Sequence, residues 1–428
     1  MEKEKSHPKY MEAFMIHGED MTPRWDYSHH VVPPMTASVI YRVGSVERGA
    51  KGFVQFGDYD AMKKDPIYIY ERVDEPTTAM FEDRLAEAER GEMGIAFSTG
   101  MAAISAVTCA LTKSGDHIIS NDSVYGCTYS LFQNWMPGRG VDVSFAHLNG
   151  ADVEKLVRPN TRMIYFETPV NPTLELIDME SLCAKVKNIN AGRREEERIF
   201  VVVDNTFASP YCQRPLEFGV DFVVASLTKH ISGFGTDMGG IVVGPKKYYG
   251  EMMLYRKDFG GVLSGKHAWP FLVYGLPSLA TRLRQSMRTA TELAKFLETH
   301  PKVDHVLYPG LESFPQRELA RKQMRSYDGS FAPSSLLYFV LKGSPEEAKE
   351  KGMKLMNWLA DKSLSYTLAV SLGHCKTLIE HPSSMTHSSM ACDDQVKAGI
   401  DPGGVRIACG LEEPAMLIDE MESGLKQI

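Results

Sequence analysis

The sequence predicts an α/β protein, in which a large domain is built on a mostly parallel sheet and a smaller α+β domain follows at the C-terminus. Short apolar segments alternate with helical stretches, and this alternation is typical of a parallel sheet that helices cover on both faces. The chain has 428 residues, of which 43% are hydrophobic and 24% charged, so it can bury two packed cores. The strands predicted for the large domain are 94–97, 117–119, 163–166, 200–203, 222–225 and 241–243.

The elements follow one another in a simple order. Residues 1–75 are expected to form an irregular binding arm, because they mix proline, glycine, charged and aromatic residues without periodicity. A helix over 77–90 begins the large domain, which we place at 76–275. A long helix over 277–300 begins the smaller domain, 276–428. The other elements predicted there are strands 336–341, 367–372 and 405–408 and helices 345–362 and 413–426.

Composition excludes several classes of protein. The formal net charge of -8 gives no reason to expect nucleic acid or an anionic membrane as a partner. No apolar run approaches the roughly 18 residues that cross a bilayer. No apolar stretch follows the charged N-terminus, so a secretory signal is not expected. The seven cysteines include no Cys-x-x-Cys pair and no zinc-finger spacing, so we expect no metal site and reduced thiols in a cytoplasmic protein.

The most specific chemical signal lies at the ends of two predicted strands. Asp204 ends one strand and Lys229 follows the next, and ligands of such sheets bind beyond the carboxyl ends of the strands. Alone, either residue would be interpreted as a cap or a surface charge. Together they match pyridoxal 5′-phosphate (PLP), which needs a lysine amine for its aldehyde and a carboxylate for its ring nitrogen. The hydroxyls of Ser226 and Thr228 lie where a phosphate would be bound.

A second phosphate-binding element is predicted at the junction of a strand and a helix. The segment Ser98-Thr-Gly-Met101 places a glycine there, so that backbone N–H groups and the helix dipole point at an anion. Three further glycines, Gly233, Gly235 and Gly239, follow the lysine. Their spacing is not that of a dinucleotide-binding loop, so NAD is not expected.

In this order the motifs resemble the Cys/Met-metabolism family of PLP enzymes, the group of cystathionine γ-synthase, the cystathionine lyases and methionine γ-lyase. The resemblance runs from about residue 30 to the C-terminus. It implies the aspartate-aminotransferase-like fold known as fold type I. The motifs that carry it are 70–77, 98–101, 125–128, 167–172, 204–206, 226–229, 371–373, 381–387 and 405–406.

The resemblance also implies a role for each site residue. Lys229 would bond to the cofactor and move protons, Asp204 would pair with the ring nitrogen, and Tyr125 would stack on the ring. Arg406 would bind the substrate carboxylate through a two-point fork that lysine cannot imitate. The phosphate would be held by Gly100, Met101, Ser226 and Thr228, and the substrate by Asn171, Ser371 and Arg406.

The resemblance further implies an assembly in which active sites are shared. Tyr70 and Arg72 would reach the phosphate of the neighbouring subunit, within a homotetramer made of two dimers. The chain departs from the family pattern at Glu75, where the family usually has asparagine, and at Phe234, which replaces a histidine. Its segment 52–66 is longer than usual. These departures bear on the substrate more than on the cofactor.

The reaction depends on the distal part of the substrate pocket, because the family shares the apparatus that removes the α-proton. Cystathionine lyases usually carry glutamates where this chain has Ile69 and Val370. An apolar wall would leave the distal ammonium of cystathionine desolvated and unpaired. Cys127 stands where methionine γ-lyases characteristically have cysteine. We therefore expect α,γ-elimination of L-methionine to methanethiol, 2-oxobutanoate and ammonia, with Lys229, Tyr125 and Cys127 as catalytic residues.

Three alternatives stay open at the level of sequence. The chain could be a cystathionine β- or γ-lyase or a cysteine desulfhydrase with the same fold. It could be a transferase, either an O-acylhomoserine sulfhydrylase or a cystathionine γ-synthase. It could also be a PLP-binding scaffold without turnover, although the intact Lys229, Asp204, Tyr125 and Arg406 argue against that.

Overall fold

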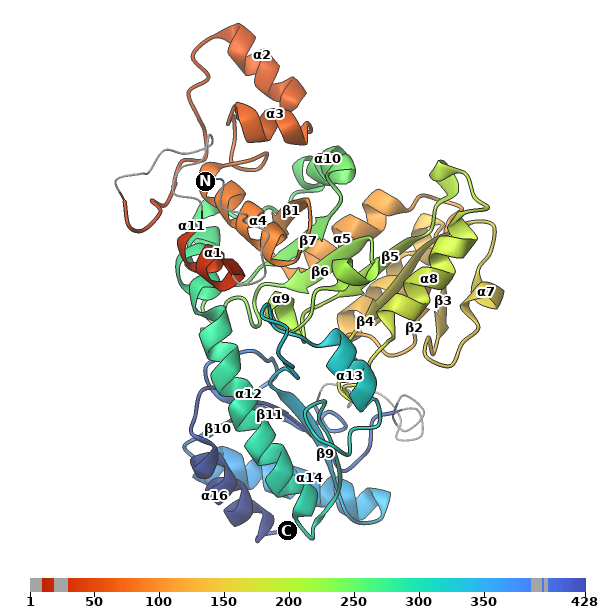
Figure 1. The fold of residues 1–428 in the computed structure, drawn as a ribbon, viewed down its shortest axis with the longest axis vertical. Helices are drawn as coiled ribbons and strands as arrows, with labels where there is room; N and C mark the ends of the chain where they lie inside the picture. The colour runs from red at the N-terminus through yellow and green to blue at the C-terminus, as the bar shows by residue number, and fades with distance from the viewer. Residues whose placement is uncertain (1–9, 19–29, 386–394, 396–398) are drawn as a thin grey trace.

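The computed structural model describes residues 10–18, 30–385, 395 and 399–428. These residues form a large domain, a smaller domain and an N-terminal arm, and the arm and the smaller domain lie at opposite ends of the large domain (Figure 1). The last two residues of the motif 381–387 lie outside the described residues.

The large domain is built on a seven-stranded sheet with the order β1-β7-β6-β5-β4-β2-β3. Strand β7 is antiparallel to β1 and β6, whereas β2 to β6 pair in parallel, which confirms the mostly parallel sheet. All six predicted strands are present. Edge strand β3 escaped prediction because it mixes polar and apolar residues. The strands are β1 (Met93–Phe97), β2 (His117–Asn121), β3 (Asp142–Ala146), β4 (Thr161–Glu167), β5 (Phe200–Asp204), β6 (Phe222–Ser226) and β7 (Gly240–Gly244).

Helices cover both faces of this sheet, which explains why its strands are apolar throughout. Val242 packs in a core shared with α5 and α10, and Val223 packs on the opposite face in a core shared with α4 and α12. Val203 packs against α8. The helices of the domain are α4 (Pro76–Ala88), α5 (Gly100–Leu111), α6 (Gly126–Ser130), α7 (Val153–Leu156), α8 (Met179–Asn190), α9 (Ser209–Cys212), α10 (Tyr249–Phe259) and α11 (Gly265–Pro270).

The smaller domain contains a five-stranded sheet with the order β10-β11-β12-β9-β8. The strand predicted over 367–372 ends at Leu368, because the chain then leaves the sheet for a loop in which Ser371 has φ 132°. Strands β8 and β11 were not predicted. The elements are β8 (Val303–Leu307), α13 (Arg317–Gln323), β9 (Leu336–Leu341), α14 (Pro345–Lys362), β10 (Tyr366–Leu368), β11 (Thr377–Glu380), β12 (Gly404–Ala408) and α16 (Pro414–Leu425).

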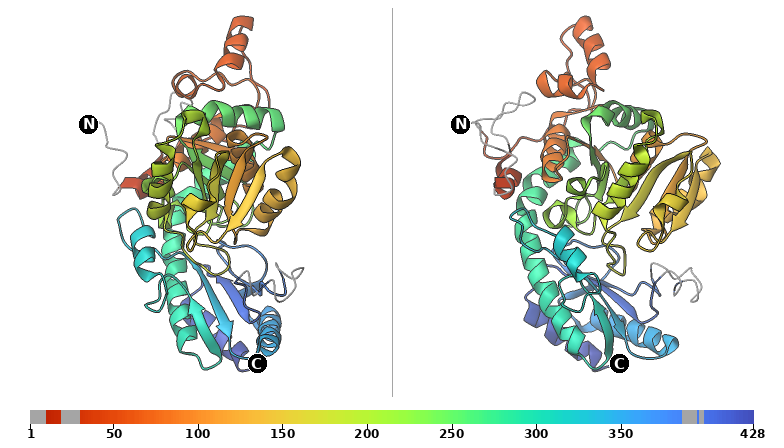
Figure 2. Two further views of the ribbon diagram at one scale, coloured as in Figure 1. Left: turned by 90° about the vertical axis from the view of Figure 1, so that its right-hand side faces the viewer. Right: turned by 45° about the vertical axis from the view of Figure 1, so that its right-hand side comes forward.

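Helix α12 (Leu276–Thr299) belongs to both domains. Both views in Figure 2 show it running from the large domain along the smaller one. Its first half contributes Leu279 and Leu283 to the core of the large domain, and its second half contributes Leu293 and Leu297 to the core of the smaller domain. The expected boundary at 275/276 thus falls at the start of this helix, although the packing divides the helix near its middle.

The prediction of an irregular N-terminal arm is wrong. The arm contains α1 (Met11–His17), α2 (Val46–Gln55) and α3 (Tyr59–Lys64), and α2 and α3 project from the end of the molecule (Figure 1). The side chains of Ser45 and Asp58 cap α2 and α3 by accepting backbone N–H groups, a signal that the sequence analysis overlooked.

Candidate active site

The predicted residues Asp204 and Lys229 lie at the carboxyl ends of two adjacent parallel strands, because Asp204 ends β5 and Lys229 lies in the turn after β6. Glu167 and Asp204 end adjacent parallel strands and lie opposite each other in register. Thr206 connects the ends of β5 and β6, because its N–H donates to Asp204 Oδ1 over 2.9 Å and its Oγ1 accepts from Ser226 N over 2.8 Å. The sheet thereby fixes a carboxylate and the start of the lysine turn in one crevice.

Lys229 is held by a residue of the smaller domain. Its Nζ donates to Ser371 Oγ over 2.7 Å, so the loop that replaces the end of the predicted strand 367–372 reaches into the large domain. Burial lowers the pKa of Lys229, and the positive charge of Arg406 lowers it further. Both effects favour the neutral amine, the form that can attack an aldehyde.

Glu167 is a buried carboxylate and Asp204 a half-buried one, and their environments differ. Burial raises the pKa of both groups, and the charge of Asp204 contributes to raising the pKa of Glu167 to about 8. Asp204 accepts from Thr206 and, over 3.5 Å, from the hydroxyl of Tyr165, so it is the better stabilised anion. The charge of Asp204 thus favours the protonated form of Glu167, and the two hydrogen bonds that Asp204 accepts favour its ionised form, which a partner for a pyridinium requires.

The predicted phosphate site is a cradle at the N-terminus of α5. Gly100 and Met101 are the first two residues of the helix, so their N–H groups have no intrahelical acceptor. Gly100 lies against Ser226, and a Cβ added to it would lie 3.1 Å from Ser226 Cβ. Thr228 Oγ1 accepts from Gly239 N over 3.1 Å, which holds its hydroxyl in the same turn. The free amides, the hydroxyls and the helix dipole fit a phosphate, and with Lys229 and Asp204 they fit PLP.

Tyr125 and Cys127 also lie together. The backbone N–H of Tyr125 donates to Glu167 Oε1 over 2.5 Å, and its side chain, 48% exposed, faces solvent. A hydrogen bond with the Cys127 side chain, followed by burial, raises the pKa of Tyr125 to about 12. The phenol thus stays protonated and can donate its proton.

Arg406 lies on β12 and is only 5% exposed. Its Nη1 donates to Asn171 Oδ1 over 3.0 Å, and its Nη2 donates to Ser371 O over 2.9 Å. Burial lowers the pKa of Arg406, and the carboxylate of Glu380 opposes that effect. Asn171, Ser371 and Arg406, the three residues predicted to bind substrate, are therefore brought together. Glu380 lies beside Arg406 in the same group.

Two functional neighbours were missed from sequence. Glu380 ends β11, just before the motif that begins at residue 381, and its position beside Arg406 depends on strand pairing that the sequence does not reveal. Phe207 follows the Asp204 motif, and the guanidinium of Arg406 lies 5.9 Å from its ring centre. A search for apolar residues next to the Asp204 motif would have found Phe207.

Tyr70 and Arg72 are exposed and are not bonded to the phosphate cradle of their own chain. A hydrogen bond links the guanidinium of Arg72 to the carbonyl of Lys257, at the end of α10, and the guanidinium lies 5.5 Å from the ring centre of Tyr70.

The distal positions are apolar in structure as in sequence. Val370 is 59% exposed and precedes Ser371, and Ile69 is half-buried against Gly52.

The departures from the family pattern have structural explanations. Glu75 is the buried N-cap of α4, and its carboxylate accepts the N–H groups of Thr77 and Thr78. The carbonyl of Phe234 accepts from His374 Nε2 over 2.8 Å, provided that this ring nitrogen carries the proton. The long segment 52–66 forms the end of α2 together with α3.

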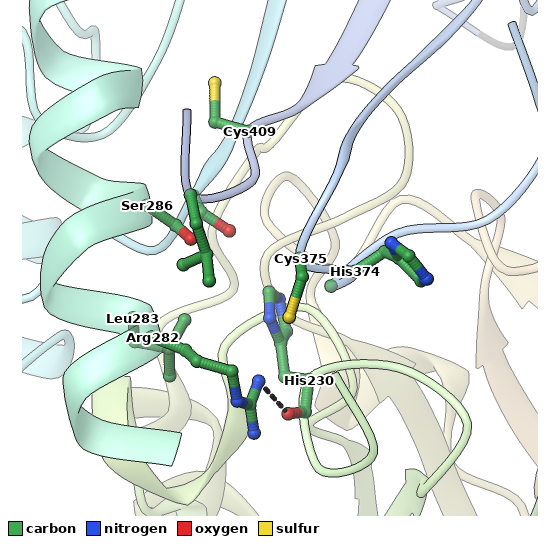
Figure 3. A pocket seen from close by; sticks show the side chains of 10 residues that line it. His230, Arg282, Leu283, Ser286, His374, Cys375 and Cys409 are labelled. Atoms are coloured by element: carbon green, nitrogen blue, oxygen red, sulfur yellow. Dashed lines mark hydrogen bonds between the residues drawn. The ribbon is translucent and has the colours of Figure 1, made fainter. Parts of the chain in front are cut away.

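A small cavity lies beside His230, the residue that follows Lys229 (Figure 3). It measures about 10 Å³, room for one water molecule, and His230, Arg282 and Cys375 line it. Burial lowers the pKa of His230 to about 3, so its imidazole is neutral. The cavity is too small for an amino acid, so the group around Lys229 and Arg406 is the candidate substrate site.

The residues that the structure describes contain no group of three or more His, Cys, Asp or Glu side chains that could hold a metal ion. They also contain no helix long and apolar enough to cross a membrane.

Comparison with known proteins agrees with this geometry. The family model of the Cys/Met metabolism PLP-dependent enzymes matches residues 12–426. The chain is 39% identical over 397 residues to an L-methionine gamma-lyase of Fusobacterium nucleatum, covering 92% of this chain and 93% of that protein. It is 35% identical over 423 residues to an L-methionine gamma-lyase of Pseudomonas putida, covering 98% of each. It is also 37% identical over 362 residues to a cystathionine beta-lyase of Coxiella burnetii, covering 84% and 87%.

Proposed function

The chain belongs to the Cys/Met-metabolism family of PLP-dependent enzymes, and from that premise we propose that it is a carbon–sulfur lyase that converts L-methionine to methanethiol, 2-oxobutanoate and ammonia. The observation that carries the choice of methionine is the apolar side chain of Val370, exposed beside the residue that binds Lys229. An S-methyl group is compatible with that surface, whereas a distal ammonium would be left without a counter-charge.

Each residue of the crevice has a defined task in this proposal. When bound, PLP supplies an aldehyde for the lysine amine and an electron-withdrawing ring. Lys229, with its pKa lowered by burial, provides a neutral amine and moves the α-proton at its Nζ. The carboxylate of Asp204, which accepts hydrogen bonds from Thr206 and Tyr165, would pair with the ring nitrogen. Gly100 and Met101 hold the phosphate through their N–H groups, together with the hydroxyls of Ser226 and Thr228.

Arg406 orients the substrate. Asn171 and Ser371 each accept one of its N–H groups, which fixes the plane of the guanidinium. A substrate carboxylate that binds this group places its α-carbon beside Lys229, because Ser371 contacts both residues. The same loop therefore couples substrate position to proton transfer.

Tyr125 and Cys127 act on the leaving group. The hydroxyl of Tyr125, with a pKa raised to about 12, keeps its proton and would donate a hydrogen bond to the methanethiolate that departs from the γ-position. Cys127 holds the hydroxyl in place by accepting a hydrogen bond from it before the thiolate forms. Both residues are therefore assigned as catalytic, together with Lys229.

The active unit is proposed to be a homodimer, paired into a tetramer in the cytoplasm. Val46, Phe53 and Val54 expose an apolar face on α2, next to the segment that carries Tyr70 and Arg72. An apolar surface of this kind is typical of a protein interface. Covering it with a second copy would direct Arg72 toward a neighbouring phosphate.

A second candidate function is cleavage of cystathionine, because cystathionine lyases of Coxiella burnetii and Bacillus subtilis are 37% and 36% identical to this chain. The deciding experiment is a steady-state comparison of methionine with cystathionine, measured as release of 2-oxobutanoate or pyruvate. We expect the larger kcat/KM for methionine. A larger kcat/KM for cystathionine would replace the methionine assignment with the cystathionine one.

A further inference from the structure

Glu380 is a buried carboxylate directly opposite Arg406. The antiparallel register of β11 and β12 pairs the two residues, so their side chains leave the sheet on the same face. Arg406 Nη2 lies 2.9 Å from Glu380 Oε2, and Glu380 is 2% exposed. The guanidinium that is proposed to bind a substrate carboxylate already has a carboxylate as its partner.

Binding of substrate therefore brings two carboxylates to one guanidinium. Nη2 of Arg406 contacts both Glu380 and the carbonyl of Ser371, and Nη1 is bonded to Asn171. A second negative charge in this buried space repels the first, and two carboxylates that share a site do not both stay ionised easily.

The charged groups that act on Glu380 come from two directions. Arg406 faces it from β12, and Lys229 acts on it from the turn after β6. On the other side, β10 presents Leu368, which pairs with Ile379 and brings no charge. Arg406 is the cation in direct contact with Glu380, whereas Lys229 donates its hydrogen bond to Ser371. One cation cannot balance two buried carboxylates.

We propose that Glu380 is a positioning residue that holds the Arg406 guanidinium before substrate arrives and takes up one proton when the substrate carboxylate binds. The inference rests on the proposed role of Arg406. The proton comes from solvent and bonds to a carboxyl oxygen of Glu380. The ion pair between Glu380 and Arg406 is replaced by one between the substrate and Arg406, and no covalent bond of the substrate changes. Burial already raises the pKa of Glu380, which brings this protonation within reach.

The test uses the holoenzyme and L-norleucine, the isostere of methionine that has CH2 in place of sulfur and so cannot expel a thiol. Isothermal calorimetry in buffers of different ionisation enthalpy counts the protons taken up on binding. We expect the wild type to take up about one proton more than Glu380→Gln. Any proton that the amino groups gain or lose on binding is the same in both proteins and cancels in the difference. Above the pKa of Glu380, the ratio of the Kd of the wild type to that of the variant should rise about tenfold per pH unit.

Controls separate this inference from the proposed function. Glu412→Gln removes a carboxylate at the other end of β11, where it accepts from Thr377, and should behave as the wild type does. Equal proton counts and a flat Kd ratio overturn the role of Glu380, provided that Arg406→Ala still weakens norleucine binding. Norleucine binding that is unchanged by Arg406→Ala overturns the role of Arg406 itself.

A second variant keeps the inference testable if Glu380→Gln does not fold. Glu380→Asp preserves the charge, and the ordinary pKa of aspartate is lower than that of glutamate. The pH at which norleucine affinity changes should therefore move. A midpoint that is unmoved in Glu380→Asp would rule out Glu380 as the group that takes up the proton.

Discussion

Replacing Arg406 by alanine removes the guanidinium that is proposed to bind the substrate carboxylate. The perturbation is local, because the partners of Arg406 are the carbonyl of Ser371, the amide oxygen of Asn171 and the carboxylate of Glu380. None of them belongs to the phosphate cradle, so the cofactor should still bind. Substrate affinity and orientation should be lost together.

The magnitude follows from the burial of Arg406. Solvent cannot replace a guanidinium that is 5% exposed, so truncation should cost about 2–5 kcal/mol, the range for one partner of a buried charge pair. At 1.36 kcal/mol per factor of ten, kcat/KM for methionine should fall by about 30-fold to 5000-fold. Arg406→Lys keeps the charge but cannot bond to Asn171 and Ser371 at once, so its loss should be smaller but still about tenfold or more.

The assay is steady-state formation of 2-oxobutanoate, measured together with the visible absorbance of the bound cofactor. Arg288→Ala is the matched control, because that arginine is exposed on α12 and pairs with Glu413 at the surface. The reasoning predicts normal absorbance in both variants and a loss of activity in Arg406→Ala alone. A near-normal kcat/KM in Arg406→Ala would show that the substrate carboxylate is bound elsewhere.

Four further predictions follow from the same geometry. Lys229→Ala should lose the visible absorbance of lysine-bound PLP and all turnover, and a variant that keeps both would refute the assignment. Mixing inactive Arg72→Ala with inactive Lys229→Ala subunits should restore part of the activity if sites are shared between subunits, and verified hybrids without activity would argue against sharing. Burial raises the pKa of Glu89 to about 8. The unfolded chain therefore ionises first as pH rises, and the wild type should lose stability between about pH 5 and 8, a loss that Tm measurements should find reduced in Glu89→Gln. Ile69→Glu combined with Val370→Glu should raise the ratio of kcat/KM for cystathionine to that for methionine, and an unchanged ratio would contradict the distal-pocket argument.

The bond between Lys229 and Ser371 links the two domains at the reacting amine. Ser371 belongs to the loop after β10, whereas Lys229 follows β6 of the large sheet. Ser371 has φ 132°, a conformation that costs a non-glycine residue energy, so the surrounding packing must maintain it. Substrate position and lysine orientation therefore depend on how the smaller domain is packed.

Local patterns in the sequence are sufficient to predict the parts of the protein that depend on residues close together in the chain. Apolar runs of four or five residues separated by helical stretches determined the parallel sheet, since such strands are stable only when both faces are covered. Asp204 ends one of those strands and Lys229 lies in the turn after the next, so their position at the same edge of the sheet follows from parallel topology. Gly100 at the start of a helix predicts a phosphate cradle for a similar local reason.

The segments that complete the site are far apart in the chain, and their contacts depend on how the whole protein packs. Glu380 and Arg406 are paired by the register of two strands whose sequences do not specify their partner, and a shift of one residue would send one side chain to the other face. Ser371 was expected within a strand, but the chain leaves the sheet before this residue. Its hydroxyl accepts a hydrogen bond from Lys229 instead. The helices of the arm were missed because they are short, and because Ser45 and Asp58 were not interpreted as the caps that begin two of them. Local pattern reports which face of an element is buried, whereas the partner across that face is set by packing of the whole chain.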